Sequence, residues 1–387
     1  MRSVLLVAFF LLLASTSQAV DINVPGDYST IQAAIDAATS TDRVVVGPGT
    51  YAENITLKDA VDVLSTDGPG STTIDGGGVD VRTVVADGVV AIFEGFTITG
   101  GDATTNGGGM QVVNNSILMV VDCVFTGNNA DGQGGGMSVQ GAQADVSNCV
   151  FSMNTAAGGA AVYVDDTQVS EVFFTDCEMY DNTATGPGGA MIIRNGAADI
   201  VRCSFHGNTA TNLGGAISSD GSELLVSECA FYLNTGSEGG GVSMNAVSSG
   251  EIDQCTFYMN SAALGGCISC TNDSDPTISY SILAGSTAGA ALDCGLGSEP
   301  IVDCCDMFGN DGGDALPACA VSTGNNISAD PQFCMVAPEM SGIFTLQSDS
   351  PCTALNSACG LIGRDEEACG TDSVDPSTWG RIKSSYR

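Results

Sequence analysis

The stretch Cys123-Val-Phe-Thr-Gly-Asn-Asn-Ala-Asp-Gly-Gln-Gly-Gly-Gly-Met137 decides the fold, because the chain returns to it five more times with variations. The copies share Cys-x-Phe-x-x-Asn, a variable loop, and a Gly-Gly pair followed by a small apolar residue. They begin at cysteines that lie 26, 28, 26, 26 and 26 residues apart, namely Cys123, Cys149, Cys177, Cys203, Cys229 and Cys255. A period of this length that recurs so evenly indicates a solenoid.

Each repeat contains short runs of alternating apolar residues, which is the period of a strand with one buried face. After the Gly pair these are Met137/Val139, Ala161/Tyr163, Met191/Ile193, Val242/Met244 and Ile268/Cys270. Cys and Phe, two residues apart, belong to a second strand. A further apolar residue lies three positions before each Cys, as Val120 does before Cys123. Three is an odd number, so the chain must bend there, and a polar residue such as Asp122 suits the corner.

Three strands and three corners per repeat predict an all-β fold, a right-handed parallel β-helix with three sides. Stacking coils at the spacing of neighbouring strands puts equivalent side chains above one another. We expect columns of the repeat cysteines, of Phe125, Phe151, Phe205, Phe231 and Phe257, and of Asn128, Asn154, Asn182, Asn208, Asn234 and Asn260. The Asn amides can pass hydrogen bonds from coil to coil, and the Gly pairs suit a corner with positive φ. All these residues are interpreted as structural, and no catalytic or metal-binding residue is predicted.

The chain divides into five predicted segments. Residues 1–19 have the pattern of a secretory signal, with cleavage after Ala19. Residues 20–60 form an N-terminal cap and first coil, in which Ser29 or Thr30 caps a short helix with an apolar stripe. Residues 61–325 form the β-helix, whose repeat decays after Cys255. Residues 326–370 form a cysteine-rich C-terminal cap, and residues 371–387 a flexible tail.

The chain is strongly acidic. Without the signal, nine cations stand against 45 acids, a net charge of −36. This charge excludes nucleic acid and anionic membranes as partners and favours a solvated acidic surface. Calcium binding by Asp clusters is the alternative, although no calcium-binding repeat or loop motif occurs and no cofactor is otherwise expected. Beyond the signal, no apolar run is long enough to span a bilayer.

All 16 cysteines lie after the signal, as expected for an oxidising compartment. We expect disulfides chiefly among Cys294, Cys304, Cys305, Cys319, Cys334, Cys352, Cys359 and Cys369. The repeat cysteines either pair vertically or stay as buried thiols. Cys267-x-x-Cys270 has the spacing of a redox or zinc pair, but Cys267 occupies the small-residue position of a repeat.

The repeats resemble the FxxN and GGAI repeats of polymorphic outer-membrane proteins and the right-handed β-helix proteins of the pectin-lyase-like superfamily. This resemblance covers about residues 21–300. The opening Tyr28-Ser-Thr-Ile-Gln-Ala-Ala-Ile-Asp-Ala-Ala38 and Gly49-Thr-Tyr-Ala-Glu53 also resemble the start of pectin methylesterases. The resemblance implies the fold, and we expect no membrane barrel of the kind that follows polymorphic repeats.

The motifs that carry chemistry in those enzyme families do not occur here. The paired Asp, Gln and Arg of the esterases are missing, and so is the Gly-His-Gly of polygalacturonases. The only histidine, His206, lies in a variable repeat position, and Arg194 and Arg202 lack the calcium-binding acids of pectate lyases. Asp165-Asp166 lies in the 28-residue coil and is the one adjacent Asp pair, but neighbouring strand residues point to opposite faces.

These observations favour a secreted or cell-surface β-helix protein without catalysis, which presents loops for adhesion or glycan binding. Its expected partner is an extracellular polysaccharide or a cell-envelope component. The alternative is a polysaccharide lyase or hydrolase of the pectin-lyase-like class, with Asp165 as the residue to test. A purely structural envelope role is a third hypothesis, and the basic tail with Arg381 and Lys383 is either a docking signal or a frayed end.

Overall fold

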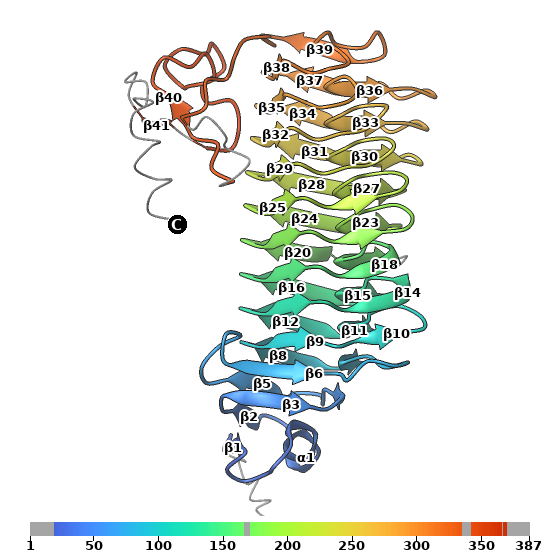
Figure 1. Cartoon of the computed structure of the whole chain (residues 1–387), viewed down its shortest axis with the longest axis vertical. Coiled ribbons are helices and arrows are strands. Elements are labelled where there is room, and N and C mark those ends of the chain that lie inside the picture. Colours follow the sequence, from blue (N-terminus) through green and yellow to red (C-terminus); the bar gives the residue numbers. More distant parts are fainter. Residues whose placement is uncertain (1–18, 166–170, 335–341, 366, 370–387) are drawn as a thin grey trace, which may run out of the picture.

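The computed structural model describes residues 19–165, 171–334, 342–365 and 367–369. Over these residues the chain winds into a tall parallel β-helix (Figure 1). Each regular coil contributes one strand to each of three sheets, here called A, B and C, and neighbouring coils pair in parallel. The predicted fold class is confirmed. The predicted signal segment, except residue 19, and the predicted tail lie outside the described residues.

Sheets A and B make two sides of the solenoid. Sheet A has 13 strands: β1 Asp21–Val24, β2 Arg43–Val46, β5 Asp62–Ser65, β8 Val90–Glu94, β12 Ile117–Val121, β16 Gln143–Ser147, β20 Glu171–Thr175, β24 Ala197–Val201, β28 Glu223–Ser227, β31 Ser249–Asp253, β34 Thr277–Ser279, β37 Ile301–Asp303 and β39 Val321–Gly324. Sheet B has 11: β3 Gly49–Ala52, β6 Thr72–Asp75, β9 Thr97–Thr99, β13 Val124–Thr126, β17 Val150–Ser152, β21 Glu178–Tyr180, β25 Ser204–His206, β29 Ala230–Tyr232, β32 Thr256–Tyr258, β35 Ile282–Ala284 and β38 Asp306–Phe308.

Sheet C makes the third side, and a short sheet D lies between sheets B and C in the middle coils. Sheet C has 10 strands: β4 Ile55–Thr56, β7 Val84–Asp87, β11 Met110–Val113, β15 Met137–Gln140, β19 Val162–Asp165, β23 Met191–Arg194, β27 Ile217–Asp220, β30 Val242–Asn245, β33 Ile268–Cys270 and β36 Leu292–Cys294. Sheet D has five: β10 Asp102–Ala103, β14 Asn129–Gln133, β18 Thr155–Gly158, β22 Thr183–Ala184 and β26 Thr209–Ala210. The repeat pattern did not predict sheet D, because its residues lie in the variable loop.

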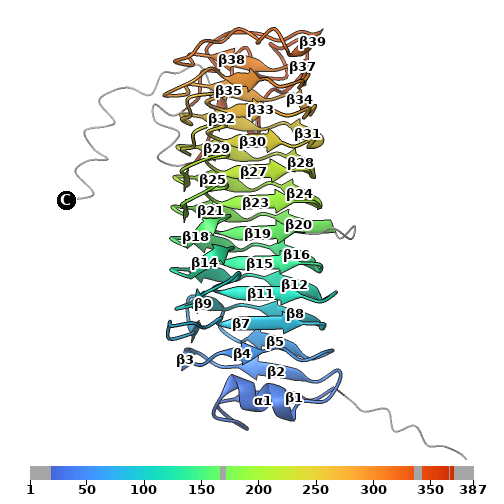
Figure 2. The same cartoon turned by 90° about the vertical axis from the view of Figure 1, so that its right-hand side faces the viewer.

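A short helix covers the N-terminal end of the solenoid (Figure 2). Helix α1 spans Ile31–Ala37, and Thr30 caps it by accepting a hydrogen bond from the Ala33 backbone N–H. Its predicted apolar stripe is buried. The predicted capping helix is confirmed. Among the described residues, no helix has both the length and the apolar character needed to cross a membrane.

The corner between sheets A and B follows the prediction made from the odd spacing. Asp122, Asn148 and Asp176 all have positive φ, which turns the chain from one face to the next. The repeat cysteine that follows points into the core as a free, buried thiol. The Cys123 backbone N–H points at the Cys149 Sγ at 3.4 Å, so the column is one of thiols and not of disulfides.

The predicted asparagines line the next corner as a column of buried amides. Asn154 shows the repeated geometry: its Nδ2 donates to Asn182 Oδ1 at 3.0 Å and to the Phe125 carbonyl at 3.0 Å. Beside this column, Phe rings of successive coils stack, with ring centroids 4.7 Å apart for Phe125 and Phe151. Met179 occupies the place of a Phe in the third coil.

The Gly corner leads into sheet C, where one predicted register is wrong. In the coil after Cys149, Val162 and not Ala161 pairs with Met137, so the core-facing residues are Val162 and Val164. Tyr163 lies on the outer side of the sheet. The error arose because the corner glycine with positive φ in this coil is Gly159, the second of its pair, whereas in the preceding coil it is Gly134, the first of its run.

The repeat continues beyond the point where it was expected to decay. Ser281 and Cys305 take the position of the repeat cysteine, and Leu283 and Met307 extend the Phe column. Ser281 replaces the repeat cysteine, and the coil from Ser281 to Cys305 is two residues shorter than most, which hides the period in the sequence. Disulfides join Cys294 to Cys319 and Cys304 to Cys359, and Cys334 is also disulfide-bonded. Contrary to prediction, Cys305 and Cys352 are buried free thiols.

The C-terminal segment packs along the side of the solenoid. Its short strands β40 Leu346–Gln347 and β41 Glu367–Cys369 stand beside the last coils in Figure 1. Phe344 packs on Ala230 and Tyr232, and Leu346 on Ile282, so this segment covers the outer face of sheet B. In the hydrophobic clusters of the described residues, no part of the C-terminal segment packs on the outer face of sheet A.

Candidate functional site

The outer face of sheet A, called face A below, exposes large apolar side chains along much of the solenoid. These are Val90, Ile117, Met119, Phe173, Leu225, Ile301 and Val321. Each lies on a strand whose alternate residues fill the core. The outward-facing positions therefore do not need to be apolar for the core to pack. Val90 pairs with Ile117 and Ile301 with Val321, so the apolar surface is continuous at these two places, and a larger apolar patch marks an interaction site more often than isolated exposed residues do.

Apolar and acidic residues alternate in the middle of face A from one coil to the next. The residues in this row, called the central column, are Met119, Asp145, Phe173, Asp199, Leu225 and Glu251. Each pairs in register with the next, on strands β12, β16, β20, β24, β28 and β31. Because neighbouring strands lie about 4.8 Å apart, successive acids of the column are about 9.6 Å apart.

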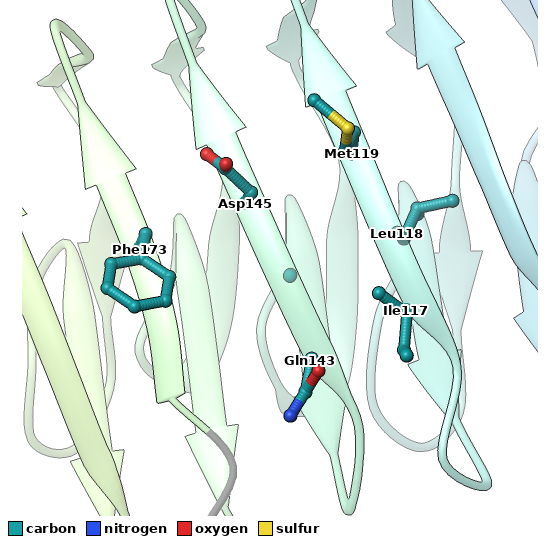
Figure 3. Close-up of a pocket in the computed structure, with 7 residues that line it drawn as sticks. Ile117, Leu118, Met119, Gln143, Asp145 and Phe173 are labelled. Atoms are coloured by element: carbon teal, nitrogen blue, oxygen red, sulfur yellow. The ribbon is translucent and has the colours of Figure 1, made fainter.

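Two shallow grooves are open on this column. The larger, of about 520 Å³, lies over β12, β16 and β20 (Figure 3). It is lined by Ile117, Leu118, Met119, Gln143, Ala144, Asp145 and Phe173. The second, of about 230 Å³, is lined by Asp199, Val201, Leu225, Val226, Ser227, Glu251 and Asp253. Figure 3 shows Met119, Asp145 and Phe173 side by side on three strands, so an elongated ligand can contact all three.

The strands of face A carry acidic side chains and few basic ones. Its strands from β5 to β39 contain no Lys or Arg. The nearest cation along the chain, Arg202, lies at the corner after β24 and is paired with Asp176 at 2.8 Å, which lowers the pKa of that carboxyl. Among the described residues, no ion pair includes Asp145 or Glu251.

Asp165 lies away from face A, at the end of β19 in sheet C, and its predicted neighbour Asp166 is outside the described residues. Its carboxylate accepts hydrogen bonds from the Tyr163 hydroxyl at 2.6 Å and from Asn195 Nδ2 at 3.2 Å. Arg194, on the next strand, pairs with Asp220 at 3.3 Å. Burial and the Asp165 carboxylate raise the pKa of Tyr163 to about 12.

His206 makes specific side-chain contacts, although its variable position in the repeat predicted none. Its ring stacks between those of Tyr180 and Tyr232, at centroid distances of 5.0 and 4.7 Å, and its Nε2 lies 3.0 Å from the Glu178 carboxylate. The hydrogen bond to His206 lowers the pKa of Glu178. A pattern in the sequence indicates this stacking, because rings recur one residue after each Phe position, in Tyr180, His206, Tyr232 and Tyr258.

Cys267 and Cys270 are both fully buried in the core, where desolvation raises the pKa of each thiol far above its usual range. A thiol that resists ionisation is a poor nucleophile and a poor metal ligand. Within the described ranges, no group of three His, Cys, Asp or Glu residues is placed to hold a metal ion.

Comparisons with known proteins agree with the observed architecture. A family model for a right-handed β-helix region matches residues 160–329. Among solved structures, pectate lyase Pel9A is 12% identical, with a TM-score of 0.53, over 91% of this chain and 97% of that one. The A-module of the mannuronan C-5 epimerase AlgE6 from Azotobacter vinelandii is 13% identical, with a TM-score of 0.42, over 78% and 95%. A pectin methylesterase from Aspergillus niger is 16% identical, with a TM-score of 0.38, over 82% and 93%.

The comparison with curated proteins returned no match. At 12% identity the likeness to the pectate lyase shows the fold alone, which is a right-handed parallel β-helix.

Proposed function

We propose that the protein is an exported glycan-binding or adhesion protein without catalysis, and that face A is its binding surface. The observation that carries this proposal is the pair of open grooves lined by exposed apolar side chains and carboxylates. Pyranose rings have apolar faces and hydroxyl edges, and face A offers a partner for each. Disulfides at Cys294 and Cys304 support an oxidising compartment, which fits a protein displayed outside the cell.

The exposure of Asp145 and Glu251 in the central column does not favour acid–base cleavage of a glycan. Glycosidases hold two carboxyl groups on either side of one bond, with one of them kept protonated by its surroundings. In the column, Asp145 and Glu251 are exposed to solvent, whereas the protonated carboxyl group of such an enzyme is enclosed by apolar surroundings. A repeated, exposed acid is suited to binding a long chain at several equivalent places.

Replacing Phe173 tests the binding role directly. We expect Phe173→Ala to weaken the binding of the recognised polysaccharide about tenfold, equivalent to about 1.4 kcal/mol. The measurement is affinity electrophoresis or calorimetry against a panel of neutral, acidic and basic polysaccharides, with and without Ca²⁺. Phe308→Ala is the matched control, because Phe308 is exposed to 36% and Phe173 to 37%, but Phe308 lies on sheet B. Equal binding by both variants, or no binding by the wild type, would reject face A as the site.

The second candidate is a polysaccharide lyase or hydrolase, which the cluster around Arg194 favours. Asp165 and Asp220 flank Arg194 on adjacent strands, and the Tyr163 hydroxyl donates a hydrogen bond to Asp165. Release of unsaturated or reducing ends from the same panel, abolished by Asp165→Ala and retained by the surface control Asp311→Ala, would establish catalysis. Binding without any release of ends would support the non-catalytic proposal.

A further inference from the structure

The alternation in the central column selects for a particular kind of ligand. Repulsion between like charges on adjacent strands would be relieved by any neutral residue placed between them. Here Phe173 and Leu225 lie between acids and Met119 lies beside the first acid, and all three are large, apolar and exposed to between 37% and 44%. Met119 and Phe173 line one groove of face A and Leu225 lines the other, so their placement points to a ligand that lies across the grooves and covers them.

We propose that this ligand is an extended polysaccharide that carries positive charges, a polymer of amino sugars. The inference rests on the proposed function and adds the charge and spacing of the ligand. The acids Asp145, Asp199 and Glu251 bind its ammonium groups, and the apolar residues between them pack against ring faces. Charge complementarity supports this occupant, because face A has no cation on its strands beyond β2 and the chain has a net charge of −35.

The spacing of the column matches such a polymer. In an extended β-1,4-linked chain of pyranose rings, successive rings turn opposite ways, so every second ring presents the same group to one side. The acids recur at every second coil, about 9.6 Å apart, and the apolar residues recur at the same interval. The two periods are of comparable length, so one ligand can meet several acids with equivalent groups.

A polypeptide fits face A less well. An extended peptide usually joins a sheet at a free edge, where unpaired backbone groups accept it. The strands that carry the column are paired on both sides, as β20 is with β16 and β24. Their flat outer face offers side chains only. The rows beside the column add small hydroxyl residues such as Ser147, Thr175 and Ser227, which suit sugar hydroxyl groups.

The test compares β-1,4-linked glucosamine hexamers with their N-acetylated counterparts, which have the same length and rings but no charge. We expect the charged hexamer to bind at least tenfold more tightly, with an affinity that falls as salt is added. The triple variant Asp145→Asn, Asp199→Asn, Glu251→Gln should abolish this difference. The control variant Asp131→Asn, Asp311→Asn, Glu299→Gln removes the same net charge outside face A and should retain it.

Different outcomes separate the two proposals. Equal binding of both hexamers, weakened by Phe173→Ala, would keep glycan binding and overturn the charged ligand. Loss of binding in both triple variants would show that the net charge of the protein, and not the acids of face A, determines binding. This result would also overturn the proposal of a charged ligand on face A. Oligolysine that binds as tightly as the glucosamine hexamer, or self-association abolished by Phe173→Ala, would assign face A to another occupant. Absence of binding to any polysaccharide would reject the proposed function itself.

Discussion

Asp306 is a carboxyl group buried where the C-terminal segment meets the solenoid. Its Oδ1 accepts a hydrogen bond from the Ala329 backbone N–H at 3.0 Å, and its Oδ2 lies 3.2 Å from the Cys352 thiol. Burial raises the pKa of Asp306 to about 6, and the nearby carboxylates Asp314 and Asp330 act in the same direction. The folded protein therefore keeps this proton at pH values where the unfolded chain has lost it.

The sign of the resulting pH dependence follows from this difference. Because the folded-state pKa of Asp306 is raised, its contribution to stability is present below the ordinary Asp value and is lost as pH rises toward about 6. Each unit of pKa separation is worth about 1.4 kcal/mol. We expect Asp306→Asn to flatten the decrease in urea midpoint between pH 4 and pH 7, since an amide keeps both contacts without ionising. Asp311→Asn, an exposed neighbour, should leave the decrease intact; an equal change in both would contradict this account.

At the scale of the element, the Gly corner joins the variable loop to sheet C. Gly134 has a φ of +70°, and a Cβ there would lie 2.3 Å from the Met137 carbonyl oxygen. Gly141 has a φ of +56° but has open space around it. Substitutions at the two glycines therefore allow two free-energy costs to be measured separately: that of the left-handed backbone and that of a steric clash.

We expect Gly134→Ala to lower the free energy of unfolding by clearly more than Gly141→Ala. The left-handed conformation alone costs about 1–2 kcal/mol for a residue with a Cβ, and this applies to both positions. Only Gly134→Ala must also move backbone atoms of β15. Denaturation by urea gives the comparison, and similar losses for the two variants would show that the corner relaxes without strain.

Also at this scale, the repeat allowed the sheets to be predicted because inward-facing side chains must recur at a fixed interval. Where a coil gained or lost residues, the interval failed: Tyr163 was assigned to the wrong face, and Cys305 was not recognised as part of the column. The candidate site has a subtler signal. The central column is the residue four positions before each repeat cysteine, from Met119 to Glu251, and it differs from coil to coil. Because a repeat is recognised by similar residues at equivalent positions, an alternation of apolar and acidic residues is not recognised as part of it. The packing of Phe344 on sheet B lies outside the repeat and has no periodic pattern in the sequence.

At the scale of the whole molecule, stability is transmitted from coil to coil along one dimension. Each coil contacts chiefly its two neighbours, so the stability of the stack depends on the interactions between adjacent coils. The Asn column supplies such bonds in the middle of the molecule. Asn182 accepts from the backbone and side chain of Asn154 and donates to Asn208 Oδ1 and the Phe151 carbonyl.

Replacing Asn182 by Ala should weaken the stack at its centre. The substitution leaves the Asn154 backbone N–H and the Phe151 carbonyl buried without these partners, and each unsatisfied group costs about 1–3 kcal/mol. We expect a lower urea midpoint and faster hydrogen exchange in β17, β21 and β25, while the capped N-terminal coils stay protected. Asn212→Ala is the control, because Asn212 is exposed in the loop after β26. If that variant loses as much protection as Asn182→Ala, or if exchange rises uniformly along the chain, the amide column does not hold adjacent coils together.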